Sequence, residues 1–261
     1  FNTMLEVGLM TFIERKEQIL DILKSSSEIC SIDTLVKKLY VSKSTLRRDL
    51  IALEEEGIII RYHGGIRLIS KSSTEASVML RYMENQDKKI AISKSSRKFL
   101  HDDMVIFLDS SSTVSYLLPT MSDLKNITII TNGLNIATQV NTNKEINCYI
   151  CPGLLKQKSL SVIGEHTIEF LSNFHADIAF FSCKALNEDG VFEGDDSQAL
   201  CKKAMFKNSD KTILLADSTK EEATGFFKLI DYSEVDIIIS DKDFSKKLKE
   251  SIISKGCEVL C

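Results

Sequence analysis

The spacing of hydrophobic and polar positions changes once along the chain, near residue 76. Before that point, apolar residues recur three and four positions apart, as they do on the buried face of a helix. This spacing predicts three short helices, the first over residues 14–24, the second after Ser31 and the third after Ser42. Serine before a helix can accept a hydrogen bond from its first turn. Two apolar runs then flank Gly64-Gly65, which predicts a two-stranded hairpin with a tight turn.

Beyond residue 76, short apolar runs alternate with segments of helical spacing. Strands that alternate with helices are typical of a mostly parallel, doubly wound sheet. The predicted fold class is therefore α/β, with a small winged helix-turn-helix domain ahead of the sheet domain. We expect strands at 105–108, 127–131, 148–151, 178–182, 212–216 and 235–240. We expect helices at 113–118, 134–141, 165–174, 196–208 and 244–255.

The stretch from Ser70 to Ser77 is polar and rich in serine, without apolar periodicity, which is typical of a linker. We therefore predict a winged helix-turn-helix domain over residues 12–69, a linker over 70–77 and an α/β domain over 78–261. A chain of 261 residues is long enough for one small domain and one of ordinary size.

Charge is distributed unevenly along the chain. The net charge of −4 argues against a protein that coats nucleic acid indiscriminately, but five basic residues and no acidic one lie between Lys37 and Arg48. The third helix buries its leucines and leaves hydroxyls and arginines on its other faces, which suits a DNA major groove. A short basic hairpin can lie along the neighbouring backbone or minor groove. The predicted DNA-binding residues are Ser42, Lys43, Ser44, Thr45, Arg47, Arg48, Arg61, His63 and Arg67.

Two alternatives concern this basic region. A helix with one leucine stripe and several positive charges is often only a solvated surface helix, and His63 is equally suited to packing at the turn. The capped helix-turn-helix and the glycine-pair hairpin occur together and in order, which favours DNA binding.

Polar residues follow several of the predicted strands. Asp109-Ser-Ser-Ser-Thr113 precedes a helix, and hydroxyls with backbone N–H groups at a helix start can bind phosphate. Thr131-Asn132-Gly133, Pro152-Gly153 and Asp217-Ser-Thr-Lys220 follow other strands. Strand ends meet at one edge of a parallel sheet, where ligands bind. Asp109 alone is more typical of a helix cap than of a ligand contact, but together these residues predict a pocket for a small phosphorylated or polyhydroxylated ligand.

A resemblance to a known family is carried by segments spread over both predicted domains. They are Val41–Leu50, Leu53–Gly57, Arg61–Gly65, Asp109–Thr113, Thr131-Asn132, Gly164, Gly190, Asp195, Lys202 and Asp217–Lys220. With these segments the chain as a whole resembles the DeoR family of bacterial transcriptional regulators over roughly residues 14–245. The resemblance implies that the larger domain is a sugar-phosphate sensor related in fold to ribose-5-phosphate isomerase and glucosamine-6-phosphate deaminase. It also implies a repressor of a sugar uptake or catabolism operon that releases DNA when a phosphorylated sugar binds.

The effector-binding residues follow from the strand ends and the resemblance. They are Asp109, Ser110, Ser112, Thr113, Thr131, Asn132, Gly153, Asp195, Lys202 and Lys220. Two positions depart from the family pattern, since Ser111 and Pro152 stand where the family has glycine, and glycine allows a ligand to approach the backbone closely. A DNA binder whose pocket no longer senses a ligand is therefore one alternative.

A second alternative is a sugar-phosphate isomerase or deaminase joined to a DNA-binding domain. That chemistry needs a carboxylate that moves a proton next to a carbonyl. The acidic residues between Glu188 and Asp196 can supply one, although carboxylates there also favour the start of the next helix. We predict a regulator without enzymatic activity, catalytic residues or cofactor.

The remaining predictions concern metals, compartment and assembly. Seven cysteines are scattered, and Cys148 and Cys151 lack the further ligands that a zinc site needs, so we expect no metal and buried, reduced thiols in the cytoplasm. No apolar run is long enough to span a membrane. Because operators are commonly read as paired half-sites, we expect a homodimer or homotetramer, held by the sensor domain or by the segment around Val78–Leu100.

Overall fold

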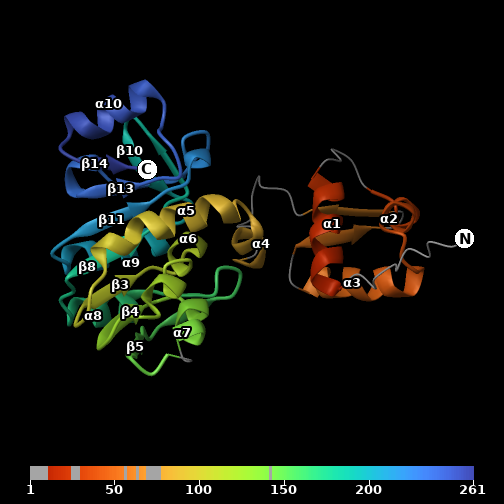
Figure 1. Cartoon of the computed structure of the whole chain (residues 1–261), viewed down its shortest axis with the longest axis horizontal. Helices are drawn as coiled ribbons and strands as arrows, with labels where there is room; N and C mark the ends of the chain where they lie inside the picture. Colours follow the sequence, from red (N-terminus) through yellow and green to blue (C-terminus); the bar gives the residue numbers. More distant parts are fainter. Residues whose placement is uncertain (1–10, 25–29, 56–57, 63–64, 69–77, 141–142) are drawn as a thin grey trace, which may run out of the picture. The chain divides into compact units, whose positions relative to one another are not determined.

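Figure 1 shows the computed structural model of the chain, which describes residues 11–24, 30–55, 58–62, 65–68, 78–140 and 143–261. The chain divides into two compact units, Phe1–Arg81 (unit 1) and Tyr82–Cys261 (unit 2). The predicted linker, residues 70–77, lies outside the described residues.

The described residues of unit 1 up to position 68 form three helices and a hairpin, as the apolar spacing predicts. Both predicted caps are confirmed, since the Oγ atoms of Ser31 and Ser42 each accept a hydrogen bond of 3.1 Å, from the N–H groups of Thr34 and Thr45. The elements are α1 (Phe12–Lys24), α2 (Ile32–Leu39), α3 (Lys43–Glu55), β1 (Ile59–Tyr62) and β2 (Gly65–Leu68). The strands are antiparallel and Tyr62 pairs with Gly65, so Gly65 belongs to a strand rather than to the turn.

The core of unit 1 is built on one stripe of α3. Leu46, Leu50 and Leu53 are almost completely buried, as their spacing predicts. An ion pair ties the same helix to α1, because the Arg15 guanidinium donates two hydrogen bonds to the Asp49 carboxylate, at 2.7 and 3.0 Å. The Asp49 side chain is only 5% exposed, so this contact lies inside the fold.

Unit 2 is organised around a seven-stranded sheet in which every neighbouring pair is parallel, which confirms the predicted α/β class. In order across the sheet, the strands are β14 (Glu258–Leu260), β13 (Ile237–Ile239), β11 (Thr212–Leu215), β8 (Ile178–Phe181), β3 (Val105–Leu108), β4 (Ile127–Thr131) and β5 (Ile146–Ile150). The helices of this unit are α4 (Val78–Met83, which crosses the boundary), α5 (Gln86–Ser96), α6 (Ser112–Ser115), α7 (Leu134–Val140), α8 (Glu165–Ser172), α9 (Asp196–Lys207) and α10 (Lys246–Ser254).

Helices cover both faces of the sheet (Figure 1). On one face, Ile92 of α5, Val114 of α6 and Ile136 of α7 pack onto alternate side chains of the strands. On the other face, apolar residues of α8, α9 and α10 pack onto the intervening ones, among them Leu171 and Leu248. This two-sided burial explains why the strands are almost continuously apolar in sequence.

The short antiparallel strands are absent from our sequence prediction. They are β6 (Leu154–Lys156) with β7 (Ser161–Ile163), and β9 (Ala185–Asn187), β10 (Gly190–Glu193) and β12 (Phe227–Ile230) in a three-stranded sheet. The edge strand β14 is also missing from the prediction. Each of these strands has at most four residues and includes a polar or charged one, so it lacks the continuous apolar run that located the strands of the parallel sheet.

The prediction that the cysteines are buried is wrong for two of the seven. Cys148 and Cys261 are exposed; Cys148 lies on the edge strand β5, and Cys261 follows the edge strand β14. The other five are buried, and burial raises the pKa of Cys151, Cys183 and Cys257 to about 12. Within the described ranges, no three His, Cys, Asp or Glu side chains gather as a metal site would require. No helix in those ranges has both the length and the apolar character needed to cross a membrane.

Candidate functional site

The first turn of α3 carries a network of hydroxyl groups. Ser42 Oγ caps the helix and also lies 2.9 Å from Ser44 Oγ and 2.8 Å from Thr45 Oγ1. Lys43, between them, makes an exposed ion pair with Asp33 at 2.7 Å. The predicted DNA-binding residues at the helix start thus lie together on an accessible surface. Beyond the cap and the ion pair, these hydroxyl groups can still donate or accept hydrogen bonds with groups in a DNA groove.

Arg47 and Arg48 lie on the exposed side of α3. Neither guanidinium has a hydrogen-bond or ion-pair partner among the residues that the structure describes. The acidic residue beside them, Asp49, is turned into the fold and neutralised by Arg15. The two arginines therefore present uncompensated positive charge, which a phosphate or a guanine edge can meet.

The hairpin contributes the rest of the predicted DNA surface. Arg61 lies on β1 and Arg67 on β2, and the neighbouring Ile66 links the hairpin to Cys30 through backbone hydrogen bonds of 2.7 and 2.8 Å. His63 lies outside the described residues.

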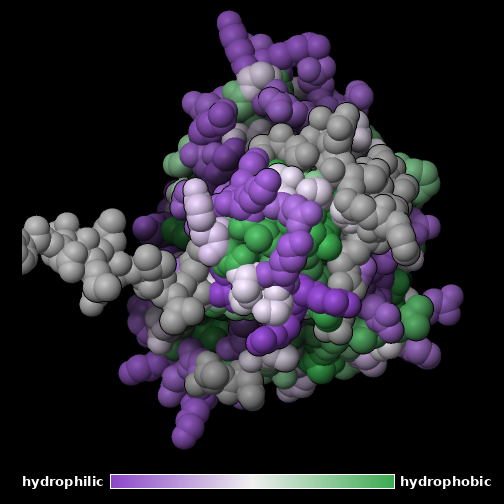
Figure 2. All heavy atoms as spheres, turned by 90° about the vertical axis from the view of Figure 1, so that its right-hand side faces the viewer, coloured by the Kyte–Doolittle hydropathy of each residue, from purple (hydrophilic) through white to green (hydrophobic). Residues whose placement is uncertain are grey.

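Figure 2 shows one face of the molecule, on which purple hydrophilic side chains lie around and across a green hydrophobic area.

In unit 2, the strand ends meet where the order of strands reverses. The chain runs from β3 outward through β4 to β5, then returns to the other side of β3 with β8. Loops after β3 and β8 therefore diverge, and such switch points are where doubly wound sheets bind ligands. Asp109, directly after β3, is fully buried there and accepts hydrogen bonds from the N–H groups of Ser111 at 2.9 Å and Ser182 at 3.1 Å.

A buried lysine completes this arrangement. Lys202 Nζ, on α9, lies 2.9 Å from Asp109 Oδ2 and donates to Glu193 Oε1 at 2.7 Å and to the carbonyl oxygen of Ser182 at 2.6 Å. Burial opposes the charge on Lys202, but the two carboxylates outweigh it and raise the pKa of the lysine above its ordinary value. An ammonium has three donors, so Lys202 is fully engaged within the chain. The sequence predicts an effector contact for Asp109 and Lys202, whereas the structure gives both internal partners.

Most side-chain hydroxyls of the loop after Asp109 make no hydrogen bond within the described part of the chain. Ser111 caps α6 by accepting a hydrogen bond from the N–H of Val114 at 3.3 Å. The side-chain hydroxyls of Ser110, Ser112 and Thr113 have no hydrogen-bond partner in the described part of the chain. All three residues are at least nine-tenths buried, so these hydroxyls are held at the strand end rather than free in solvent.

The loop after β4 packs directly against this hydroxyl-rich loop. A Cβ atom on Gly133 would lie 2.9 Å from the Cα of Ser110, so glycine permits the contact. Thr131 Oγ1 accepts from the N–H of Gly133 at 3.0 Å. Asn132 donates its amide to the carbonyl of Val162 at 3.0 Å, while its buried Oδ1 has no partner among described residues. Asn132 thus retains an acceptor that a ligand hydroxyl can use.

Gly153 and Asp195 have structural roles in the fold. At Gly153 the φ angle is +142°, and a Cβ atom there would meet the carbonyl oxygen of Ile163 at 2.7 Å. Asp195 caps α9 by accepting from the N–H of Gln198 at 3.0 Å, and it pairs with Lys156 at 2.9 Å. Both positions are thus explained by packing and capping.

Lys220 lies in the loop after β11 and is half-buried. Its ammonium has no ion-pair or hydrogen-bond partner in the described ranges. It lies close enough to Cys183, after β8, for its charge to oppose the effect of burial on the pKa of that thiol. Cys183 follows Ser182, which donates to Asp109, so Lys220 approaches the switch point from the β8 side.

Several residues that are not among the predicted site residues also contact the loop after β11. Asn85 Nδ2 donates to Asp217 Oδ1 at 3.4 Å, and Lys88 Nζ donates to Ser218 Oγ at 3.0 Å. Asp241, after β13, accepts from the N–H of Ser218 at 2.6 Å. The position of Asp241 at a strand end was available from the sequence, but Asn85 and Lys88 come from a helix start more than 100 residues away, about which local pattern says nothing.

The acidic residues between Glu188 and Asp196 do not converge. Glu188 pairs with Lys247 at 2.8 Å, and Glu193 is buried against Lys202. Glu193 also accepts from the N–H of Gly194 at 3.2 Å, through its second carboxylate oxygen. Asp189, which has no side-chain hydrogen bond or ion pair among the described residues, is exposed on the surface rather than held in a pocket.

Comparison with known proteins agrees with this two-part arrangement. Residues 15–72 match the model of the DeoR-like helix-turn-helix domain, and residues 84–242 match that of the DeoR C terminal sensor domain. A DNA-binding domain ahead of a sensor domain defines a ligand-responsive class of regulator. The chain belongs to the DeoR family of transcriptional regulators, which confirms the resemblance found in the sequence.

Individual relatives cover almost the whole chain. An uncharacterized HTH-type transcriptional regulator of Haemophilus influenzae is 31% identical over 246 residues, covering 94% of this chain and 96% of that protein. The glycerol-3-phosphate regulon repressor of Escherichia coli is 27% identical over 229 residues, covering 87% and 90%. Among solved structures, ribose 5-phosphate isomerase A of Methanocaldococcus jannaschii aligns with 53% of this chain and 55% of its own, at 17% identity and a TM-score of 0.38.

Proposed function

We propose that the chain represses an operon for sugar uptake or catabolism and releases its operator when a phosphorylated sugar binds at the strand ends of unit 2. The observation that carries the proposal is the half-buried Lys220 ammonium, which lacks a partner among the described residues, beside a switch point lined by unengaged hydroxyls. A cation without an internal partner and several hydroxyls suit the binding of a phosphate. The name of the Escherichia coli relative, a repressor of a glycerol-3-phosphate regulon, supports a small phosphorylated polyol.

In this proposal the predicted effector residues divide into two groups. Ser110, Ser112, Thr113 and Lys220 contact the phosphate, and Asn132 accepts from a sugar hydroxyl. The other predicted residues shape the pocket through internal partners and contact the effector only if these bonds rearrange. They are Asp109, Thr131, Asp195 and Lys202. Gly153 shapes the pocket through its positive φ and close packing.

Two contacts support a coupling between this pocket and the start of unit 2. Tyr116, just after α6, donates its hydroxyl to the carbonyl of Tyr82 at 3.0 Å. Asn85 and Lys88 bond to the loop that carries Lys220. An effector that draws the two loops together changes the surroundings of residues 82–88, and chain connectivity passes that change toward unit 1. Coupling requires the effector to favour one arrangement over the other.

The DNA-binding part of the proposal predicts that Arg47→Ala or Arg48→Ala weakens operator binding by about 1–3 kcal/mol. The physical reason is the loss of an exposed, unpaired guanidinium from α3. The operator is first selected from a random duplex library, and binding is then measured by fluorescence anisotropy across a salt series. Lys246→Ala is the control, because it removes a positive charge from a 90% exposed side chain of unit 2, outside the predicted DNA-binding residues. Unchanged affinity in both arginine variants at matched salt would contradict the assignment of α3.

The effector part predicts that Lys220→Ala binds the operator normally but is no longer released from it by the phosphorylated sugar. Calorimetry with glucose 6-phosphate and sn-glycerol 3-phosphate, against glucose and glycerol, tests whether phosphate is recognised. A ligand at 100 times its Kd stabilises the fold by about 2.7 kcal/mol, which a thermal-shift screen of further sugar phosphates detects. Lys246→Ala, at a 90% exposed lysine side chain, is the control. Equal affinity for the phosphorylated and the unphosphorylated compound, or normal release in Lys220→Ala, would show that the phosphate group is not recognised.

The coupling predicts that Lys88→Met binds the effector with little change but releases DNA less completely. The substitution removes the bond to Ser218 and the 3.9 Å approach to Asp241, and leaves the pocket hydroxyls in place. Calorimetry measures effector binding, and anisotropy of the operator complex measures release. Loss of both responses together would mean that Lys88 belongs to the pocket itself.

The enzymatic alternative receives less support. A general base has to reach the proton that it moves, whereas both oxygens of Glu193 are engaged within the chain. The relatives that cover the chain are named as regulators and repressors. An assay for isomerisation of ribose 5-phosphate by the purified chain separates the two functions, and turnover would favour the enzyme.

A further inference from the structure

The edge strand β5 and the start of β6 leave a group of apolar side chains open to solvent. Tyr149 and Ile150 are 49% and 41% exposed, and Leu154 and Leu155 are 70% and 43% exposed. Half of the large hydrophobic side chains that are exposed in the described part of unit 2 thus lie within one short stretch of chain. The others are scattered singly, at Ile90, Leu200, Phe226 and Ile253. A contiguous exposed apolar patch marks an interaction site, whereas single residues do not.

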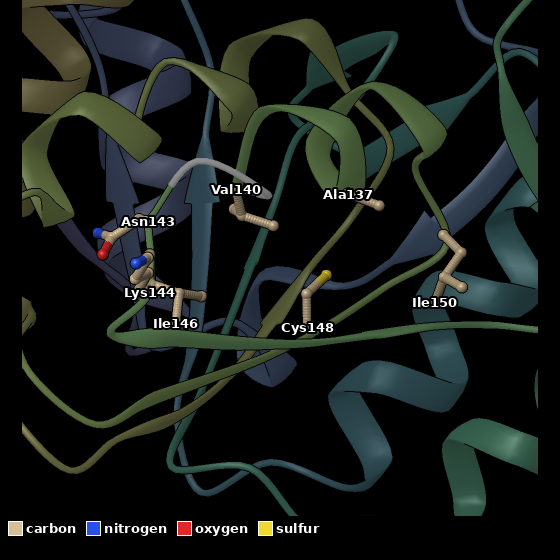
Figure 3. Close-up of a pocket in the computed structure, with 7 residues that line it drawn as sticks. All are labelled: Ala137, Val140, Asn143, Lys144, Ile146, Cys148 and Ile150. Atoms are coloured by element: carbon tan, nitrogen blue, oxygen red, sulfur yellow. The ribbon is translucent and has the colours of Figure 1, made fainter.

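Both faces of β5 contribute to this surface. On one face, Ile146, Cys148 and Ile150 line a hollow of about 380 Å³ together with Ala137 and Val140 of α7 (Figure 3). This hollow lies at the edge of the sheet, away from the strand ends that form the effector site. The other face carries Tyr149, whose ring centroid lies 5.3 Å from that of Phe174.

The backbone of β5 is also available for pairing. The N–H of Cys151 donates to the carbonyl of Thr131 at 2.9 Å, toward β4. Alternate residues of a strand direct their backbone groups to opposite edges. Ile146, Cys148 and Ile150 therefore direct their backbone groups away from β4. The N–H of Ile146 donates to the carbonyl of Asn143 at 3.3 Å, whereas those of Cys148 and Ile150 have no partner among the described residues. Within the described ranges, no other strand pairs with that edge.

The edge lacks the features that normally prevent pairing. Proteins protect edge strands with lysine, proline or bulges, but Ile146–Ile150 contains no charged residue and no proline. The opposite edge of the sheet differs, because β14 carries Glu258 and packs Val259 and Leu260 onto the core. The contrast indicates that β5 is covered in the assembled protein.

We propose that β5 pairs antiparallel with β5 of a second copy of the chain, about a two-fold axis at Cys148. Residues 146–155 carry no charge, so two identical surfaces meet without like-charge contacts, as a two-fold interface requires. The free edge fits an extended strand, and a helix-turn-helix regulator uses two copies to read paired half-sites. In the other predicted interface segment, α5 packs Ile92 into the core of its own unit and leaves Ile90 as its one exposed large apolar side chain among the described residues.

The interface does not rest on the proposed effector, so its test needs no ligand. Light scattering with size exclusion, at about 10 µM chain, counts the copies in the wild type, Ile150→Lys and Ile253→Lys. We expect Ile150→Lys to weaken pairing on the order of 100-fold and to halve the number of copies, because it buries a charge at the interface. Ile253→Lys, which alters an exposed isoleucine on α10, leaves the count unchanged. A monomeric wild type, or an unaltered count in Ile150→Lys, would overturn the proposal.

Two further experiments keep the proposal open to refutation if Ile150→Lys fails to fold. In the antiparallel arrangement Ile146 faces Ile150 of the other copy, so Ile146→Glu with Ile150→Lys restores the assembly through opposite charges. In the unaltered chain, mild oxidation cross-links two copies, because opposed residues of paired strands lie within disulfide range. Cys148→Ser abolishes the cross-link and Cys261→Ser, at the other exposed thiol, does not. A cross-link that depends on Cys261, or none, would contradict pairing at β5.

Discussion

Lys202→Met is expected to lower the free energy of unfolding of unit 2 by about 3–5 kcal/mol. Lys202 is the one cation that contacts Asp109 and Glu193 in the described structure, and these residues are fully buried and 7% exposed. Methionine fills a similar volume but leaves two carboxylates without a counter-charge. Urea unfolding followed by far-ultraviolet circular dichroism measures the change.

The neighbouring Lys203→Met is the matched control. Lys203 is exposed on the same helix, with its ammonium 5.1 Å from the centre of the Phe227 ring. Its loss changes stability by at most about 1 kcal/mol. Adding Asp109→Asn and Glu193→Gln to Lys202→Met should restore much of the lost stability, because the two amides carry no charge that needs a partner. A Lys202→Met protein as stable as the wild type would show that the contacts of Lys202 with Asp109 and Glu193 do not stabilise unit 2.

Arg15→Ala is expected to destabilise unit 1 by about 3–5 kcal/mol and to abolish operator binding through unfolding of the unit. The guanidinium makes two hydrogen bonds to Asp49, whose side chain is 5% exposed, so its removal leaves a buried charge. Hydrogen exchange followed by mass spectrometry measures the effect locally. Amides of α3 should lose protection, while those of β11 in unit 2 keep theirs and serve as an internal reference.

Removal of an exposed ion pair in the same unit provides the comparison. Lys43→Ala breaks the contact with Asp33, where both side chains are about two-thirds exposed or more, and should change stability by less than about 1 kcal/mol. Arg15→Met with Asp49→Leu should recover much of the lost protection, since an apolar pair replaces the ionic one. Equal exchange in Arg15→Ala and the wild type would mean that leucine packing alone holds α3.

The sequence by itself determined the order of elements and the two kinds of unit. Leucine spacing located α3. Ser31 and Ser42 marked the first turns of α2 and α3, because capping is a contact between residues close in the chain. Continuous apolar runs located β3 and β4 to the residue, since a strand buried on both faces leaves no alternation to obscure its ends. The polar character of the strand ends was equally visible.

Only the tertiary structure decided which of those polar groups are engaged. Asp109 and Lys202 are 93 positions apart in the numbering and resemble ligand contacts until their ion pair is seen. The sequence predicted an effector contact for Lys220, Ser110 and Thr113 as well. These three differ from Asp109 and Lys202 only in the structure, where their side chains have no partner among the described residues. Sequence pattern reports which side chains are polar, because that depends on residue type. Whether a polar group keeps a free donor or acceptor depends on neighbours that folding brings from elsewhere in the chain, as Asn85 and Lys88 are brought to the loop after β11.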